Sequence, residues 1–211
     1  MKTFDLSLYL VLDPDLCSKV GMVETARLAA EGGVTMIQLR DKGADTAALI
    51  GMGKSLQAAL VSTGIPLIIN DNVEAAIALG AAGLHVGQSD LSARESRQRI
   101  GSDMILGVSV ETVELARNID PEIVDYVGIG PVFATSTKPD HMQPIGFDGL
   151  SRIVAASPVP AVAIGGLKQG HVDNVFAAGA KGLAVVSAIC GTTDPKMASS
   201  NLCREIRRAL Q

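Results

Sequence analysis

The 211-residue chain has few aromatic residues, few cysteines and only short apolar runs, and each of these shortages argues against a class of protein. It has no Trp, and aromatic residues make up only 3% of the chain. Its apolar runs are far shorter than the ~20 residues that a membrane-spanning helix needs. Asp5, Asp13 and Asp15 interrupt the start of the chain before any small-residue cleavage site, so we expect no secretory signal. We therefore expect a globular cytoplasmic protein with no membrane partner.

Cysteine and positive charge are also scarce. Cys17, Cys190 and Cys203 cannot all pair and show no metal-type spacing, which indicates reduced thiols. The 18 Lys and Arg residues are outnumbered by 22 Asp and Glu residues, for a formal net charge of −4. This balance argues against nucleic acid as a partner, because such binding depends on clustered Lys and Arg. The oligomeric state is not decided by the sequence, which is compatible with a homo-oligomer.

Strand-like apolar runs alternate with stretches at helical spacing along the whole chain. Strands are expected at residues 7–12, 35–39, 66–69, 83–86, 104–108, 126–129, 160–164 and 182–187. Helices are expected at residues 20–31, 45–61, 72–79, 92–100, 111–118, 147–156, 169–178 and 195–210. Strict alternation favours parallel pairing with right-handed crossovers, and eight such units favour a closed barrel. We therefore predict an α/β fold in which residues 1–211 form one (β/α)8 TIM-barrel domain.

Two carboxylates stand at the carboxyl ends of predicted strands. Asp71 follows the third strand and Asp90 follows the fourth. Ligand-binding groups collect at this edge of a parallel sheet because the strand interiors are buried. Asp71 also begins a capping-box pattern with Glu74, and this alternative stays open, whereas Ser92 already caps the helix after Asp90. Neighbouring strands lie about 4.8 Å apart, so these hard oxygen donors are candidate ligands for one Mg²⁺ ion.

Three cations are candidates for binding phosphate. Arg40 and Lys42 follow the second strand with one residue between them, so both can point toward one site; solvated surface charge is the alternative. Lys138 lies in a loop of Thr and Ser residues, which is typical of a phosphate site, although a plain Ser/Thr turn has the same composition. With Mg²⁺, these cations nearly balance the charge of a diphosphate and a phosphate ester. We therefore predict two phosphorylated small-molecule substrates.

The last two predicted strands also end in residues suited to phosphate. Gly165 and Gly166 follow the seventh strand, and Ser187 ends the eighth. These are the loops where barrel enzymes most often bind phosphate through backbone N–H groups. His85 alternates with apolar neighbours inside the fourth strand, which favours a hydrogen-bonded core residue over a catalytic base.

A set of motifs resembles the thiamine phosphate synthase family, and the likeness runs from the first predicted strand to the eighth. The motifs are residues 38–42, 69–71, 85–90, 107–109, 128–138, 163–166 and 185–187. The stretch 130–138, joined with the two aspartates, is the most specific part. The resemblance implies a Mg²⁺-dependent transferase of thiamine biosynthesis. Such an enzyme condenses 4-amino-2-methyl-5-pyrimidinylmethyl diphosphate with 4-methyl-5-(2-phosphoethyl)thiazole, and thiamine phosphate forms with release of pyrophosphate by a dissociative substitution.

The resemblance also implies roles for individual residues. Asp71 and Asp90 correspond to the Mg²⁺ ligands. The implied contacts of the pyrimidine diphosphate are Gln38, Arg40, Lys42, Asn70, Ser109 and Lys138, and we count Leu39 and Asp41 in the same motif as substrate-binding. The implied contacts of the thiazole phosphate are Thr135, Ser136, Thr137, Gly166, Val186 and Ser187. The groups expected to act in catalysis are Arg40, Lys42, Ser109 and Lys138.

One position departs from the family pattern, and two alternatives stay open. Many relatives have His where this chain has Glu111, and the resemblance implies that related thiazole tautomerases use that histidine to transfer a proton. A glutamate there favours the synthase. The first alternative is a thiazole tautomerase or another phosphate-binding TIM-barrel isomerase, which would need one phosphate site and no metal. The second is a non-catalytic sensor of phosphorylated ligands.

Overall fold

The computed structural model describes residues 2–135 and 143–211, and its eight parallel strands close into a barrel in chain order. The strands are β1 (Leu8–Leu12), β2 (Met36–Leu39), β3 (Leu67–Asn70), β4 (Gly83–Val86), β5 (Ile105–Val110), β6 (Tyr126–Ile129), β7 (Ala161–Ile164) and β8 (Leu183–Val185). The ring closes where β1 pairs with β8, with Leu10 opposite Val185. The predicted (β/α)8 barrel is therefore confirmed.

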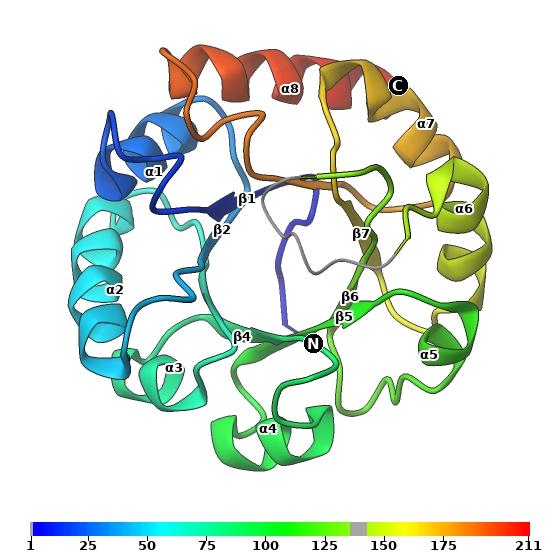
Figure 1. Ribbon diagram of the computed structural model, residues 1–211, viewed down its shortest axis with the longest axis horizontal. Helices are drawn as coiled ribbons and strands as arrows, with labels where there is room; N and C mark the ends of the chain where they lie inside the picture. The colour runs from blue at the N-terminus through cyan, green and yellow to red at the C-terminus, as the bar shows by residue number, and fades with distance from the viewer. Residues whose placement is uncertain (1, 136–142) are drawn as a thin grey trace.

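Helices form a ring outside the strands (Figure 1). They are α1 (Met22–Glu31), α2 (Thr46–Leu60), α3 (Val73–Leu79), α4 (Ala93–Ile100), α5 (Val113–Arg117), α6 (Gly146–Ala156), α7 (Val172–Ala177) and α8 (Pro195–Ala209). A 3₁₀ turn, η1 (Gln169–His171), precedes α7, so the helix expected at 169–178 is divided. Gly170 within that turn disfavours a regular α-helix. In the part of the chain that the structure describes, no helix is both long and apolar enough to span a membrane.

The core has two layers because successive strand side chains point to opposite faces. Leu8, Leu10 and Leu12 of β1 point outward and pack in the core between strands and helices. Tyr9 points inward, where it packs with a second cluster inside the barrel that includes Tyr126. Side chains that continue the inward rows toward the carboxyl ends of the strands therefore meet around the barrel axis, and this positions the site.

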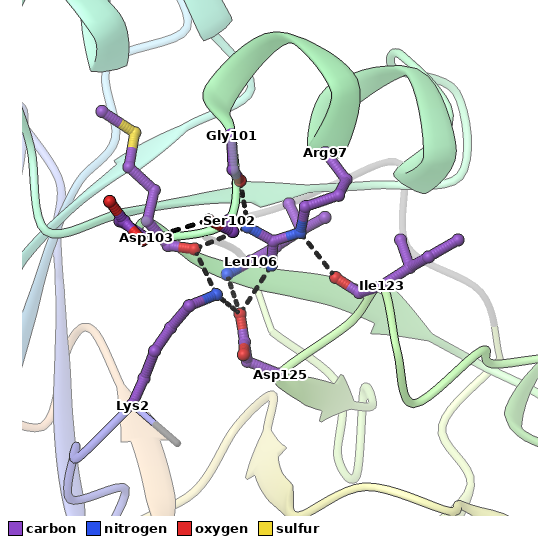
Figure 2. A network of polar contacts seen from close by, with 9 residues as sticks. Lys2, Arg97, Gly101, Ser102, Asp103, Leu106, Ile123 and Asp125 are labelled. Atoms are coloured by element: carbon purple, nitrogen blue, oxygen red, sulfur yellow. Dashed lines mark hydrogen bonds and ion pairs between the residues drawn. The ribbon is translucent and has the colours of Figure 1, made fainter.

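The opposite, amino-terminal end of the barrel is tied together by one carboxylate. Oδ2 of Asp125 accepts hydrogen bonds from Nζ of Lys2 at 2.7 Å, Nη2 of Arg97 at 2.7 Å and the backbone N–H of Leu106 at 2.8 Å. Figure 2 shows Lys2 and Arg97 approaching Asp125 from different segments. Arg97 also donates to the carbonyl of Ile123 at 2.9 Å. The network thus fixes the start of the chain and α4 against β5 and β6.

Replacing Asp125 with alanine is expected to lower the free energy of unfolding by about 2–3 kcal/mol, because two cations and one backbone N–H lose their acceptor. Glu74→Ala is a matched control, since it removes a carboxylate that pairs with Arg99 at 2.7 Å on the exposed surface. That control should change stability by no more than about 0.5 kcal/mol. Urea unfolding of both variants measures the difference, and equal losses would contradict a special role for Asp125.

Candidate active site

A cavity of about 370 Å³ opens at the carboxyl ends of the strands. Side chains from the ends of different strands line it, as expected for a barrel of this class. The sequence-predicted residues that line it are Gln38, Arg40, Lys42, Asn70, Asp71, Asp90, Ser109, Thr135, Gly166, Val186 and Ser187. The barrel therefore brings residues from distant parts of the chain to one site.

The carboxylates of Asp71 and Asp90 face each other in this cavity. The Asp71 backbone has a φ of 61°, and its N–H donates to the carbonyl of His85 on the neighbouring strand at 2.8 Å. Asn72 is the residue whose side chain caps α3, so Asp71 has no capping duty. Asp90 accepts from the backbone N–H of Gly87 at 2.7 Å. The sequence left open a capping role for Asp71, and the structure gives that role to Asn72.

Burial, and after it the approach of Asp90, shifts the pKa of Asp71. Burial, a hydrogen bond with Asp90 and the charge of Asp90 together raise the pKa of Asp71 to about 6, against the opposing effects of Lys42 and Asn70. A cation between the two carboxylates would reduce the repulsion between their negative charges. Within residues 2–135 and 143–211, no group of three or more His, Cys, Asp or Glu side chains could hold a metal ion. Two carboxylates fit Mg²⁺, which retains several waters or takes phosphate oxygens for its remaining ligands.

Arg40 and Lys42 supply positive charge just after β2, which pairs with β3. The Arg40 side chain is 17% exposed, and its Nη1 lies 4.0 Å from Oδ2 of Asp13. Among the described residues the Arg40 guanidinium donates no hydrogen bond, although it carries five N–H groups. Those donors therefore face the cavity and are suited to an anionic ligand.

Two glycines at the end of β7 line the cavity. Gly165 and Gly166 have φ angles of 100° and 64°, in the region that favours glycine. A Cβ at Gly166 would lie 2.8 Å from both the Cβ of Phe133 and the carbonyl oxygen of Ala134. Only glycine therefore lets the β6–α6 segment lie this close to the β7 end.

Comparison with known proteins identifies the family of the chain. The family model described as thiamine monophosphate synthase matches residues 8–189. The chain belongs to this family. A thiamine-phosphate synthase from a Psychrobacter species is 46% identical over 200 residues, 93% of each chain, and one from Azorhizobium caulinodans is 46% identical over 201 residues, 94% of each chain. The solved thiamine phosphate pyrophosphorylase from Pyrococcus furiosus has a TM-score of 0.88 and 33% identity, and the match covers 98% of each chain.

Not every residue that the family resemblance suggested lies in the cavity. Leu39 is fully buried in the outer core, because it alternates with the inward-pointing Gln38 and Arg40. Asp41 accepts from the backbone N–H of Gly43 at 3.0 Å and does not line the cavity. This placement does not support side-chain contacts of Leu39 and Asp41 with substrate. The other predicted positions, Ser136, Thr137 and Lys138, lie outside the described residues.

Several cavity residues were missed by sequence reasoning. Asp13 follows β1 just as Asp71 follows β3, so the same strand-end signal could have found it. Tyr9 lies within an apolar run and gave no signal. His85 is hydrogen-bonded, as predicted, yet it also lines the cavity, and so does Glu111 at the end of β5. Glu111, where the resemblance implies a histidine in many relatives, therefore faces the site.

Proposed function

We propose that this chain catalyses the condensation of 4-amino-2-methyl-5-pyrimidinylmethyl diphosphate with 4-methyl-5-(2-phosphoethyl)thiazole, forming thiamine phosphate and pyrophosphate. The observation that carries the proposal is the facing pair of Asp71 and Asp90 in the same cavity as Arg40 and Lys42. Such a set suits a diphosphate with its accompanying cation. Membership of the thiamine monophosphate synthase family supports the same activity. The free cysteines support a cytoplasmic location for the enzyme.

In this proposal the chain's residues bind and orient the two substrates. Arg40 and Lys42 contact the diphosphate, with Lys138 as a third cation, while Gln38, Asn70 and Ser109 bind the pyrimidine. The thiazole phosphate is held by Thr135, Ser136, Thr137, Gly166, Val186 and Ser187. Holding the thiazole by its phosphate orients its nitrogen toward the pyrimidine methylene carbon, which lowers the entropic part of the barrier.

The proposed reaction needs no nucleophilic side chain. The C–O bond between the pyrimidine methylene and the diphosphate breaks first, and the thiazole nitrogen then donates its electron pair to the resulting cation. Mg²⁺, which Asp71 and Asp90 would hold, supplies charge neutralisation for the diphosphate when it is bound. Arg40, Lys42 and Lys138 stabilise the negative charge that develops on the departing oxygen, in a cavity where exclusion of water strengthens their effect.

Mixing the two phosphorylated heterocycles with the protein and Mg²⁺, and measuring release of pyrophosphate, tests this function. We expect turnover that stops when EDTA removes the metal. Conversion of the thiazole substrate alone, unaffected by EDTA, would instead identify a thiazole tautomerase. Binding of both ligands without any product would identify a non-catalytic sensor. Glu111 favours the synthase over the tautomerase, because a carboxylate replaces the histidine implied for that proton transfer.

Gly166→Ala is expected to raise the KM for the thiazole phosphate by about 10-fold or more. The positive φ of residue 166 costs alanine roughly 1–2 kcal/mol relative to glycine. The added Cβ would also overlap Phe133 and Ala134. Gly170→Ala is the matched control, since no atom lies within 4 Å of its added Cβ. Steady-state kinetics with each substrate varied in turn makes the measurement. A rise confined to the KM of the pyrimidine diphosphate would show that Gly166 serves the other substrate.

A further inference from the structure

A row of hydrogen-bonded side chains crosses the barrel at the floor of the cavity, where all of its members except Tyr126 line the cavity. Nε2 of Gln38 donates to the hydroxyl of Tyr9 at 2.8 Å, and that hydroxyl lies 2.9 Å from the hydroxyl of Tyr126. The Tyr126 hydroxyl lies 2.9 Å from Nδ1 of His85. Nε2 of His85 in turn lies 3.0 Å from Oγ of Ser109. The row therefore connects Gln38 on β2 with Ser109 on β5, two residues of the proposed pyrimidine site.

The barrel is shaped to hold the centre of this row. Tyr126 is completely buried. The centroid of its ring lies 5.5 Å from that of the His85 ring and 5.9 Å from that of the Phe4 ring. A Cβ at Gly107 would overlap both the Tyr126 hydroxyl and Nδ1 of His85. One at Gly128 would lie 3.2 Å from Cε1 of His85. The two rings therefore fill space that glycines on β5 and β6 leave open, and they have little freedom to turn.

The direction of the row follows from counting hydrogens. Burial raises the pKa of both Tyr9 and Tyr126, so each phenol keeps its single hydrogen. Because Gln38 donates to Tyr9, the Tyr9 hydrogen goes to Tyr126, and the Tyr126 hydrogen goes to Nδ1 of His85. A neutral His85 then carries its hydrogen on Nε2 and donates it to Ser109. If Tyr126 donated to Tyr9 instead, the Tyr9 hydrogen would lack an acceptor among the described residues, which is unfavourable for a buried group.

We propose that Tyr126 is a positioning residue that holds His85 in its Nε2–H form and thereby directs the hydroxyl hydrogen of Ser109 into the cavity. This inference deepens the proposed function and depends on it for the identity of the ligand. Ser109, which accepts from His85, can donate its own hydrogen to a ring nitrogen. Gln38 donates one of its two amide hydrogens to Tyr9, and its carbonyl oxygen is suited to accept a hydrogen bond from a ligand in the cavity. One donor and one acceptor at the two ends of the row match the ring nitrogen and amino group of an aminopyrimidine.

Nitrogen-15 NMR of the imidazole groups in the ligand-free protein tests the direction of the row. We expect His85 in the wild type to carry its hydrogen on Nε2, with Nδ1 unprotonated. His141→Gln and His171→Gln variants assign the three histidine signals. A wild-type His85 with its hydrogen on Nδ1 would overturn the proposal, and this measurement does not depend on how well any Tyr126 variant folds.

Two matched variants test the role of Tyr126. Tyr126→Phe should allow His85 to populate the Nδ1–H form, because the donor to Nδ1 is lost. Tyr9→Phe removes a buried hydroxyl from the same cluster but leaves Tyr126 to donate to His85, so the Nε2–H form should persist. Thermal unfolding of both variants shows whether they are equally folded. An unchanged His85 form in Tyr126→Phe, or an equal change in Tyr9→Phe, would overturn the proposal.

Kinetics then connects the row to the substrate. In Tyr126→Phe we expect the KM for the pyrimidine diphosphate to rise about tenfold, the effect of losing one well-directed hydrogen bond. The KM for the thiazole phosphate should not change. An unaltered pyrimidine KM in a variant with an altered His85 form would overturn the link through Ser109. The NMR result needs no turnover, so its failure is distinct from a failure of the proposed function, which would appear as absent pyrophosphate release in the wild type.

Discussion

Asp71→Asn and Asp90→Asn are each expected to slow pyrophosphate release by at least about 10²-fold, the effect of removing a group that stabilises charge in the transition state. Each change removes one of two carboxylates that face each other in the cavity, and with it half of the protein's proposed grip on Mg²⁺. Rates measured over a range of Mg²⁺ concentrations should show half-maximal activity at a higher Mg²⁺ concentration than in the wild type. Calorimetric titration of Mg²⁺ in the presence of pyrophosphate should show the same loss without turnover.

Neither substitution should unfold the protein. Asparagine tolerates the positive φ of Asp71 at least as well as aspartate does. Burial and Asp90 raise the pKa of Asp71, which means that its ionised form opposes folding at neutral pH, and a neutral amide removes this cost. Asp71→Asn should therefore unfold at the same temperature as the wild type or at a higher one. Asp173→Asn, an equal change at an exposed pair with Arg208, is the control. Full activity in either cavity variant would refute the metal-binding role.

The barrel and the edge that holds its site could be predicted because their signals are local. Each strand is a short apolar run followed by a helical stretch, and this alternation leaves few topologies. Polar residues after the strands, such as Arg40, Asp71 and Asp90, identify the carboxyl edge, and the structure brings them together in one cavity. The alternation of side chains along β2 is also a local signal, and it separates the outward-pointing Leu39 from the inward-pointing Gln38 and Arg40.

The polar row at the floor of the cavity could not be predicted from local signals. Tyr9 and Tyr126 are 117 residues apart in the chain, and each lies within an apolar run typical of a buried strand. Their contact depends on strand register and on the space left by Gly107, which no short pattern reveals. The choice between Asp71 and Asn72 as the cap of α3 has the same character. Both residue types cap helices, and only the backbone conformation decides between neighbours.

Arg40→Ala is expected to lower kcat/KM for the pyrimidine diphosphate by roughly 10²–10³-fold, because a cation that stabilises the leaving diphosphate is lost. The structure gives a specific reason for this size. Arg40 lies largely inside the cavity, its one ionic neighbour among the described residues is 4.0 Å away, and none of its N–H groups has a protein acceptor there. A guanidinium in this state is held ready for an external anion. Steady-state kinetics with each substrate varied measures the effect.

Arg40→Lys separates charge from geometry. Lysine keeps the positive charge but lacks the planar fork that binds two phosphate oxygens together, so we expect it to restore only part of the lost activity. Arg99→Ala, at an exposed pair on the outside of the barrel, controls for loss of an arginine elsewhere. A defect confined to the KM of the thiazole phosphate would move Arg40 to the other substrate. Full rescue by lysine would show that Arg40 acts through charge alone, and the second phosphate contact inferred for its fork would then be absent.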